Sequence, residues 1–190
     1  MKARHEIVSV VDYDVAWPAA FTQLSGRIWK AVEDVALSIE HVGSTAVPGL
    51  AAKPVIDMDI VVRSTSATPT VIERLAALGY VHRGNLGIEG REAFERPPGS
   101  PAHHLYACVS GSVALRNHLH VRDWLRAHPH MAAEYGALKK ELAARFRDDI
   151  DGYAAGKTAF LLEVSRAAGF PPDELAAIAA ANQSGQRASR

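Results

Sequence analysis

From His41 to Val62 the chain reads HVGSTAVPGLAAKPVIDMDIVV. An apolar run over residues 36–42 predicts a strand that ends beside Gly43 and Ser44, and a turn-rich loop follows it. Residues 55–62 then form an apolar, β-branched run that only Asp57 and Asp59 interrupt. Because side chains alternate between the two faces of a strand, Asp57 and Asp59 are expected to point the same way.

Two carboxylates on one strand face repel each other unless a cation lies between them. Mg²⁺, or Mn²⁺ in its place, takes oxygen ligands from one or two carboxylates and from substrate phosphates. A glycine such as Gly43 lets backbone N–H groups approach a phosphate, and the Ser44 hydroxyl adds a donor. Together these features predict a site for phosphoryl or nucleotidyl transfer. The alternative is a buried strand with two aspartates near its exposed end, preceded by an ordinary Gly-Ser turn.

The spacing of Gly43-Ser44 and Asp57-Met58-Asp59 resembles the pattern of the nucleotidyltransferase superfamily. The longer run GSTAVPGLAAKPVID, at 43–57, is similar to the GrpB family. Further segments carry the resemblance across residues 6–168: YDVAWP at 13–18, RDWLRAHP at 122–129, YGALK at 135–139 and YAAGKTAF at 153–160. The resemblance implies an α+β fold, with a nucleotidyltransferase-like mixed sheet flanked by helices and a helical segment towards the C-terminus.

Composition favours one globular domain. The chain has 190 residues, of which 48% are hydrophobic and 22% charged. Lys and Arg together number 21, as do Asp and Glu, and this balance argues against binding bulk nucleic acid or an anionic membrane. A small phosphorylated ligand needs only a local basic patch. No apolar stretch is long enough for a membrane span and no signal segment is recognisable, so a cytoplasmic protein is expected.

Hydrophobic periodicity and turn residues predict the order of elements along the chain. Strands are expected at 6–11, 36–42, 55–62, 80–82, 91–96 and 103–109. Helices are expected at 18–35, 70–78, 115–129, 131–146, 151–168 and 172–181. Residues 1–168 are expected to form a single domain, with the sheet core at about 6–110 and the helical part at about 115–168. Residues 169–190 are expected to be a short helix and then a disordered tail from Asn182.

A third carboxylate on a neighbouring strand normally completes a two-metal nucleotidyltransferase site. The 91–96 strand offers Glu92 and Glu95, for which the alternative is a solvated hairpin face. The 103–109 strand offers His103 and His104 and no acid. The HLY run that begins at His104 resembles a GrpB block, so His104 is the preferred catalytic base or metal ligand, with a structural histidine as the alternative.

Four basic residues are candidates for phosphate binding. Arg122 presents a bidentate fork beside Asp123, although a helix-surface ion pair is the alternative. Lys53 lies in the loop of the opening stretch. Lys139 and Lys157 each follow a tyrosine by four residues on an expected helix, which suits either a ligand cradle or a packed tyrosine with a lysine stem beside it.

Cys108 and the clustered histidines are less favoured as site residues. Cys108 is the only cysteine, so no internal disulfide or cysteine-based zinc site is expected, and its apolar neighbours indicate a core residue. His118, His120, His128 and His130 are close in sequence but lack the spacing of a zinc-binding helix.

The leading hypothesis is a metal-dependent nucleotidyltransferase-like protein that acts on a nucleoside triphosphate and a small acceptor. Gly43 and Ser44 would hold the triphosphate, and Asp57 and Asp59 would hold Mg²⁺. A second hypothesis is a non-catalytic module that binds a nucleotide or phospho-metabolite. GrpB-like domains occur fused to dephospho-CoA kinase, so this resemblance connects the second hypothesis to coenzyme A metabolism. A third is an interaction protein that retains the fold with a degenerate site.

Overall fold

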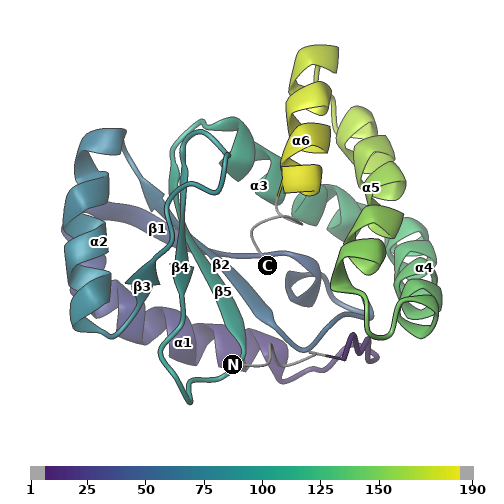
Figure 1. The fold of residues 1–190 in the computed structure, drawn as a ribbon, viewed down its shortest axis with the longest axis horizontal. Helices are drawn as coiled ribbons and strands as arrows, with labels where there is room; N and C mark the ends of the chain where they lie inside the picture. The colour runs from purple at the N-terminus through teal and green to yellow at the C-terminus, as the bar shows by residue number, and fades with distance from the viewer. Residues whose placement is uncertain (1–6, 185–190) are drawn as a thin grey trace.

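The structure is a computed structural model that describes residues 7–184 (Figure 1). Five strands form one mixed sheet in the order β1-β2-β5-β4-β3. Their bounds are β1 Ala36–Val42, β2 Ile56–Val62, β3 Val81–His82, β4 Arg91–Glu95 and β5 His103–Val109. β2 and β5 are parallel, and the other neighbouring pairs are antiparallel. The fold is therefore the expected α+β arrangement with a mixed sheet.

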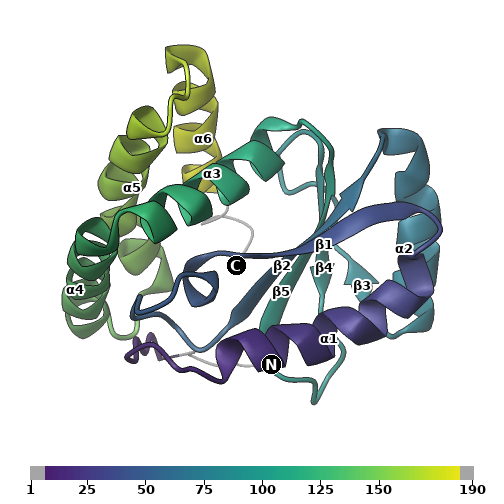
Figure 2. The same ribbon diagram turned by 180° about the vertical axis from the view of Figure 1, so that it is seen from behind.

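Helices cover both faces of this sheet. α1 (Trp17–Val32) and α2 (Thr68–Ala77) lie on one side in Figure 1, and the four later helices lie on the other. These are α3 Val113–Ala127, α4 Pro129–Arg145, α5 Ile150–Ala167 and α6 Pro172–Ser184. In the opposite view of Figure 2, α3 lies on the side of α4–α6 and runs obliquely up towards the top of the sheet, while α1 runs along the lower edge of the sheet.

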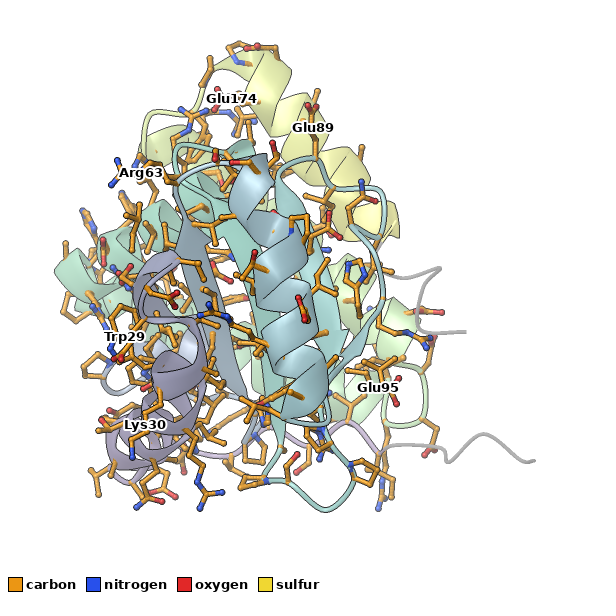
Figure 3. All side chains as sticks on the ribbon, turned by 90° about the vertical axis from the view of Figure 1, so that its left-hand side faces the viewer. Trp29, Lys30, Arg63, Glu89, Glu95 and Glu174 are labelled. Atoms are coloured by element: carbon orange, nitrogen blue, oxygen red, sulfur yellow. The ribbon has the colours of Figure 1, made fainter. Side chains whose placement is uncertain are left out.

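The alternation of side chains along β2 explains how the two faces differ. Ile56, Met58 and Ile60 point to the α1–α2 side and are buried there with residues of both helices, such as Ile28 and Leu75. In Figure 3 α2 lies in front of the sheet, and Trp29 and Lys30 mark α1 beside it. Asp57 and Asp59 therefore face the α3–α6 side.

The first expected strand, at 6–11, is wrong over its described part. From residue 7 onward the segment forms no sheet strand and pairs only through an isolated bridge between Val11 and Ala52. Val8 instead donates a backbone hydrogen bond to the carbonyl of Arg147, 2.9 Å away. The edge of the sheet next to β2 is already occupied by β1. The segment therefore forms its backbone hydrogen bonds with the loop at Ala52 and with Arg147, just after α4.

Two short 3₁₀ turns, Ser44–Ala46 and Thr65–Ala67, complete the elements. α6 continues past the expected end at residue 181 as far as Ser184, and the rest of the expected tail lies outside the described residues. Within the described chain, every helix is too short or too polar to cross a membrane.

Candidate functional site

The two aspartates of β2 form the centre of the candidate site. Asp59 is fully buried, while the side chain of Asp57 is 29% exposed. Across the parallel ladder Asp57 pairs with His104 and Asp59 with Tyr106, so these four side chains share one sheet face. The strand register thus places an acidic pair beside a histidine and a tyrosine.

Each aspartate has its own histidine partner. His104 Nδ1 lies 2.7 Å from Asp57 Oδ1, and His118 Nδ1 of α3 lies 2.7 Å from Asp59 Oδ2. Burial raises the pKa of Asp57, but the hydrogen bond with His104 and nearby positive charges outweigh this and hold it below its usual value. Burial by itself lowers the pKa of His118, yet the Asp59 carboxylate outweighs it and raises that pKa. The contact with Asp59 therefore favours the protonated form of the His118 imidazole.

Gly43 lies against the carboxylate of Asp57. Its backbone is in a left-handed conformation, with φ 70° and ψ −169°, and a Cβ at this position would overlap Asp57 Oδ2. The next residue, Ser44, opens the 3₁₀ turn and accepts a hydrogen bond from Lys139 Nζ at 2.8 Å. The Gly-Ser turn is thus connected to β2 on one side and to α4 on the other.

Two lysines face the acidic pair from the helical layer. Lys139 of α4 is 2% exposed, and its Nζ lies 4.5 Å from the ring centre of Tyr135. Burial, with the charge of Lys157 added, lowers the pKa of Lys139 to about 7. Lys157 of α5 lies 4.5 Å above the ring of Tyr153, and burial lowers its pKa to about 8, although the Asp57 carboxylate opposes the change. Both lysines are poised to gain charge when an anion binds.

Arg122 fixes α3 against the end of β1. Its Nη1 donates to Glu40 Oε2 at 3.1 Å and to the His41 carbonyl at 3.0 Å. Its Nε and Nη2 donate to the carboxylate of Asp123 at 2.7 and 3.2 Å. The ion pair with Asp123 that the sequence suggested is present, and the guanidinium lines the site as well as joining two elements.

A cavity of about 240 Å³ connects these groups. Its walls carry Gly43, Ser44, Asp57, Asn117, His118, Val121, Arg122, Leu125, Tyr135, Lys157 and Leu161. Residues far apart in sequence therefore meet around one space, with the Asp57 carboxylate on the sheet side and the cations of Arg122 and Lys157 on the helical side. This arrangement suits a ligand that carries phosphate groups together with a cation.

The acidic pair fits a hard divalent cation. Asp59 Oδ1 is buried without a hydrogen-bond partner among the residues that the structure describes. A buried acceptor of this kind normally has a donor or an ion beside it. Cys108 also approaches, since one atom each of Asp59, Cys108 and His118 lie within 4.8 Å of one another. Burial raises the pKa of the Cys108 thiol, which favours the protonated form over a thiolate ligand, so the carboxylate oxygens are the better ligands.

The candidates for a third acid do not reach the site. Glu92 points to the other sheet face and contacts His82 at 2.7 Å, and Glu95 pairs with Arg83 at 3.5 Å. His103 is buried on that same opposite face, where Tyr80 Oη lies 2.8 Å from its Nε2. The side chains that β5 turns towards the acidic pair are those of His104, Tyr106 and Cys108, and none of them is a carboxylate.

Lys53 does not line the cavity but lies close enough to affect Lys157. It is half-buried, and its charge contributes to lowering the pKa of Lys157, whose main cause is burial. The histidines 120, 128 and 130 are away from the acidic pair: His120 packs on Phe170, and His128 stacks on Trp124.

From the sequence, His118 was considered only as part of a histidine metal site and was not connected with Asp59. His118 precedes Arg122 by four residues, which places both on one face of α3, and this spacing is visible in the sequence. Arg91 and Tyr106 were also missed. The Arg91 guanidinium lies 4.5 Å from the ring centre of Tyr106, a contact between β4 and β5 that only the strand register reveals.

The mixed sheet and its helical layers have a nucleotidyltransferase-like fold. The chain aligns with the crystal structure of the Cid1 poly(U) polymerase with MgGTP bound, at a TM-score of 0.54 and 14% identity, over 85% of this chain and 55% of that one. At this identity the similarity concerns the fold alone. A crystal structure of the conserved protein GrpB from Enterococcus faecalis aligns at a TM-score of 0.77 and 32% identity, over 84% and 96% of the two chains.

The chain belongs to the GrpB protein family, whose model matches residues 7–167. The UPF0157 protein YqkA of Bacillus subtilis is 40% identical over 79% of this chain, which spans only 44% of that relative's length. A dephospho-CoA kinase of Mycolicibacterium paratuberculosis is 33% identical over 85% of this chain, again spanning about half of the relative, 46%. The matched region is therefore one part of these longer proteins.

Proposed function

We propose that this protein binds a nucleoside triphosphate with Mg²⁺ and transfers its nucleotidyl group to a small acceptor. The observation that carries the proposal is the meeting of Asp57 with the Gly43–Ser44 turn in the wall of one cavity, with Asp59 buried two residues further along the same strand face. The carboxylates would hold the cation, and the turn would present backbone N–H groups and the Ser44 hydroxyl to the phosphates. When bound, the cation would neutralise the phosphate oxygens and make the α-phosphorus more electrophilic.

The cations of the helical layer would bind the polyphosphate. Lys157 and Arg122 line the cavity, and Lys139 reaches it through Ser44. Because Lys139 and Lys157 are buried with lowered pKa values, an incoming phosphate would favour their charged forms and gain two partners in a poorly solvated place. Lys53 would add positive charge at the edge.

In the transfer step, an acceptor hydroxyl oxygen would form a bond to the α-phosphorus while the bond to the pyrophosphate oxygen breaks. His104 would accept the hydroxyl proton. Its Nδ1 contacts the Asp57 carboxylate at 2.7 Å, a contact that would orient the imidazole for this role. Asp57 would thereby orient the base.

A thermal-shift titration tests the proposal. The protein would be heated with ATP, GTP, CTP or UTP, in Mg²⁺ or in EDTA, beside the variant Asp57→Asn. A ligand at about 100 times its Kd adds about 2.7 kcal/mol of stability. We expect a Mg²⁺-dependent shift with at least one nucleotide, and loss of that shift in Asp57→Asn. An equal shift in the variant, or none in the wild type, would contradict the proposal.

A second candidate is a binding module without turnover. Its specific support is the lack of a carboxylate among the side chains that β5 presents to the acidic pair. The relatives named dephospho-CoA kinase suggest a coenzyme A precursor as the phosphorylated ligand. Pyrophosphate release separates the two candidates. If nucleotide binding were saturable but no pyrophosphate were released with any of a range of added hydroxyl acceptors, the binding module would be favoured.

A further inference from the structure

A second, larger cavity of about 680 Å³ adjoins the candidate site. Its walls come from the segment leading into β4 (87–91), the β5–α3 turn with the start of α3 (109–118), and α6. In Figure 3 Glu89, which precedes β4, and Glu174 of α6 both lie towards the top of the molecule. Arg116 of α3 forms an ion pair with Glu174, which holds α6 over this region.

Arg91 is the buried cation of this cavity. It lies on the same sheet face as Tyr106 and is 8% exposed. Its Nε has no hydrogen-bond partner, and no carboxylate pairs with its guanidinium within residues 7–184. The ring of Tyr106 stabilises one face of the guanidinium and leaves its in-plane N–H groups for another partner. Because an unpaired buried charge is costly, an anionic ligand is the partner that this arrangement suits.

The remaining walls are mostly apolar. Ile88, Val109, Val113 and Ile178 contribute hydrophobic surface, and the carboxylate-bearing Glu89 is exposed at the rim. A ligand that fills the cavity would therefore combine an apolar body with an anionic group, as ligand pockets of this size usually require.

The two cavities share a wall. Asn117 and His118, at the start of α3, line both of them. His118 also holds Asp59. A molecule in the larger cavity would thus be separated from the acidic pair only by Asn117 and His118.

We propose that the larger cavity binds the acceptor: a small hydroxyl-bearing molecule with an apolar body and a carboxylate or phosphate group that Arg91 holds. Its hydroxyl would face the acidic pair past Asn117 and His118. The role as acceptor depends on the proposed function, whereas the binding of an apolar anion at Arg91 does not.

The test uses simple probes, followed through the backbone amides of the protein by NMR. Phenyl phosphate and phenylacetate carry the two possible anions on an apolar ring, and benzyl alcohol is the neutral control. Both anionic probes, or the one whose anion matches the acceptor, should shift the amides of residues 87–91 and 112–118. Benzyl alcohol should bind at least about tenfold more weakly, because it lacks the charge-assisted hydrogen bonds.

Variants then separate this cavity from the nucleotide site. Arg91→Gln should weaken the anionic probes about tenfold or more. Ala177→Trp should also weaken binding of the anionic probes, because it fills the cavity from the exposed face of α6. This variant tests the cavity even if Arg91→Gln does not fold. Ala176→Trp, at the neighbouring exposed alanine outside the cavity lining, should leave the affinity unchanged.

The outcomes distinguish the two proposals. Probe binding that persists in saturating ATP and in Asp57→Asn, but is lost in Ala177→Trp, would support the cavity, even if no nucleotide bound. Displacement of the probes by ATP with no response to Arg91→Gln or Ala177→Trp would place them in the nucleotide site and overturn the inference. Failure of both anionic probes to shift residues 87–91 at millimolar concentration would overturn it as well.

Discussion

A Cβ added to Gly43 would lie 2.8 Å from Cγ of Asp57, closer than side-chain carbons pack. The glycine that begins the proposed phosphate-binding turn therefore also leaves the space that the first aspartate occupies. Gly43 and Asp57 are neighbours in space because β1 and β2 are antiparallel and Val42, the residue before Gly43, pairs with Asp57.

Gly43→Ala should disturb the aspartate more than the fold. The substitution adds strain at φ 70° and a collision with the carboxylate, together costing about 1–3 kcal/mol. We expect Mg²⁺-dependent nucleotide affinity to fall about tenfold or more, as measured by calorimetry. Gly49→Ala is the matched control, because Gly49 has φ 79° with no atom within 4 Å of its added Cβ. Equal nucleotide affinity in both variants would show that the contact with Asp57 has no effect on binding.

The buried Lys139 should make stability rise with pH. Its pKa falls from 10.5 to about 7 on folding, so between these values the unfolded chain binds more protons than the folded protein. The free energy of unfolding therefore increases across this window, by on the order of a few kcal/mol. Urea unfolding between pH 6.5 and 9.5 measures the slope. Lys139→Met should reduce the slope to the part that Lys157 contributes, whereas Lys140→Met, at an exposed neighbour, should leave it unchanged. A slope that is the same in all three proteins would contradict the buried charge.

Nucleotide affinity should follow the opposite trend. Phosphate binds the charged forms of Lys139 and Lys157, whose pKa values are about 7 and about 8. Affinity for Mg²⁺–nucleotide should therefore decrease as the pH rises from 6.5 to 9.5, after the protonation of the nucleotide itself is subtracted. Calorimetry in buffers of different ionisation heat would detect proton uptake on binding near pH 8. Binding without proton uptake would exclude these lysines as phosphate ligands.

Because His118 contacts Asp59, we expect the pKa of His118 to depend on the charge of Asp59, and NMR can measure that pKa. The Asp59 carboxylate raises the pKa of His118 against the effect of burial. In Asp59→Asn the charge is lost and burial remains, so the pKa of His118 should fall below its usual value. A titration of the imidazole proton signals would measure it. Asp57→Asn should change the pKa of His118 less, since Asp57 is only a minor cause of the shift.

The sequence predicted the local structure of the part of the candidate site that lies within one continuous segment. Gly43, Ser44, Asp57 and Asp59 belong to a turn and a strand whose types follow from local pattern, and period-two alternation places both aspartates on one face. β2 and β5 were found because each is an apolar run bounded by turn residues. The same alternation of apolar residues wrongly predicted a strand before α1. That segment instead pairs with Ala52 through Val11, outside the sheet.

The remaining parts depend on strand register and helix docking, which local pattern does not encode. His118 lies in the candidate site because α3 packs close enough to β2 for its Nδ1 to contact Asp59. Arg91 lies nearby because β4 pairs with β5 in the register that places Arg91 opposite Cys108. Glu92 is excluded by the same register, since it is one position away and faces the opposite side.

The neighbours His103 and His104 point to opposite faces of β5, and this contrast gives a paired test. His103 is buried between Tyr80 Oη at 2.8 Å and the Pro101 carbonyl at 2.7 Å, so His103→Leu should leave Tyr80 and that carbonyl unpaired. The expected cost is about 1–3 kcal/mol of unfolding free energy, with nucleotide affinity unchanged. His104→Gln should change stability little, because the His104 side chain is 55% exposed, and it should lower pyrophosphate release about 100-fold if His104 is the base. Denaturant melts and a pyrophosphate assay on both variants measure the two effects. If folded His103→Leu lost turnover while His104→Gln kept it, His104 would not be the base.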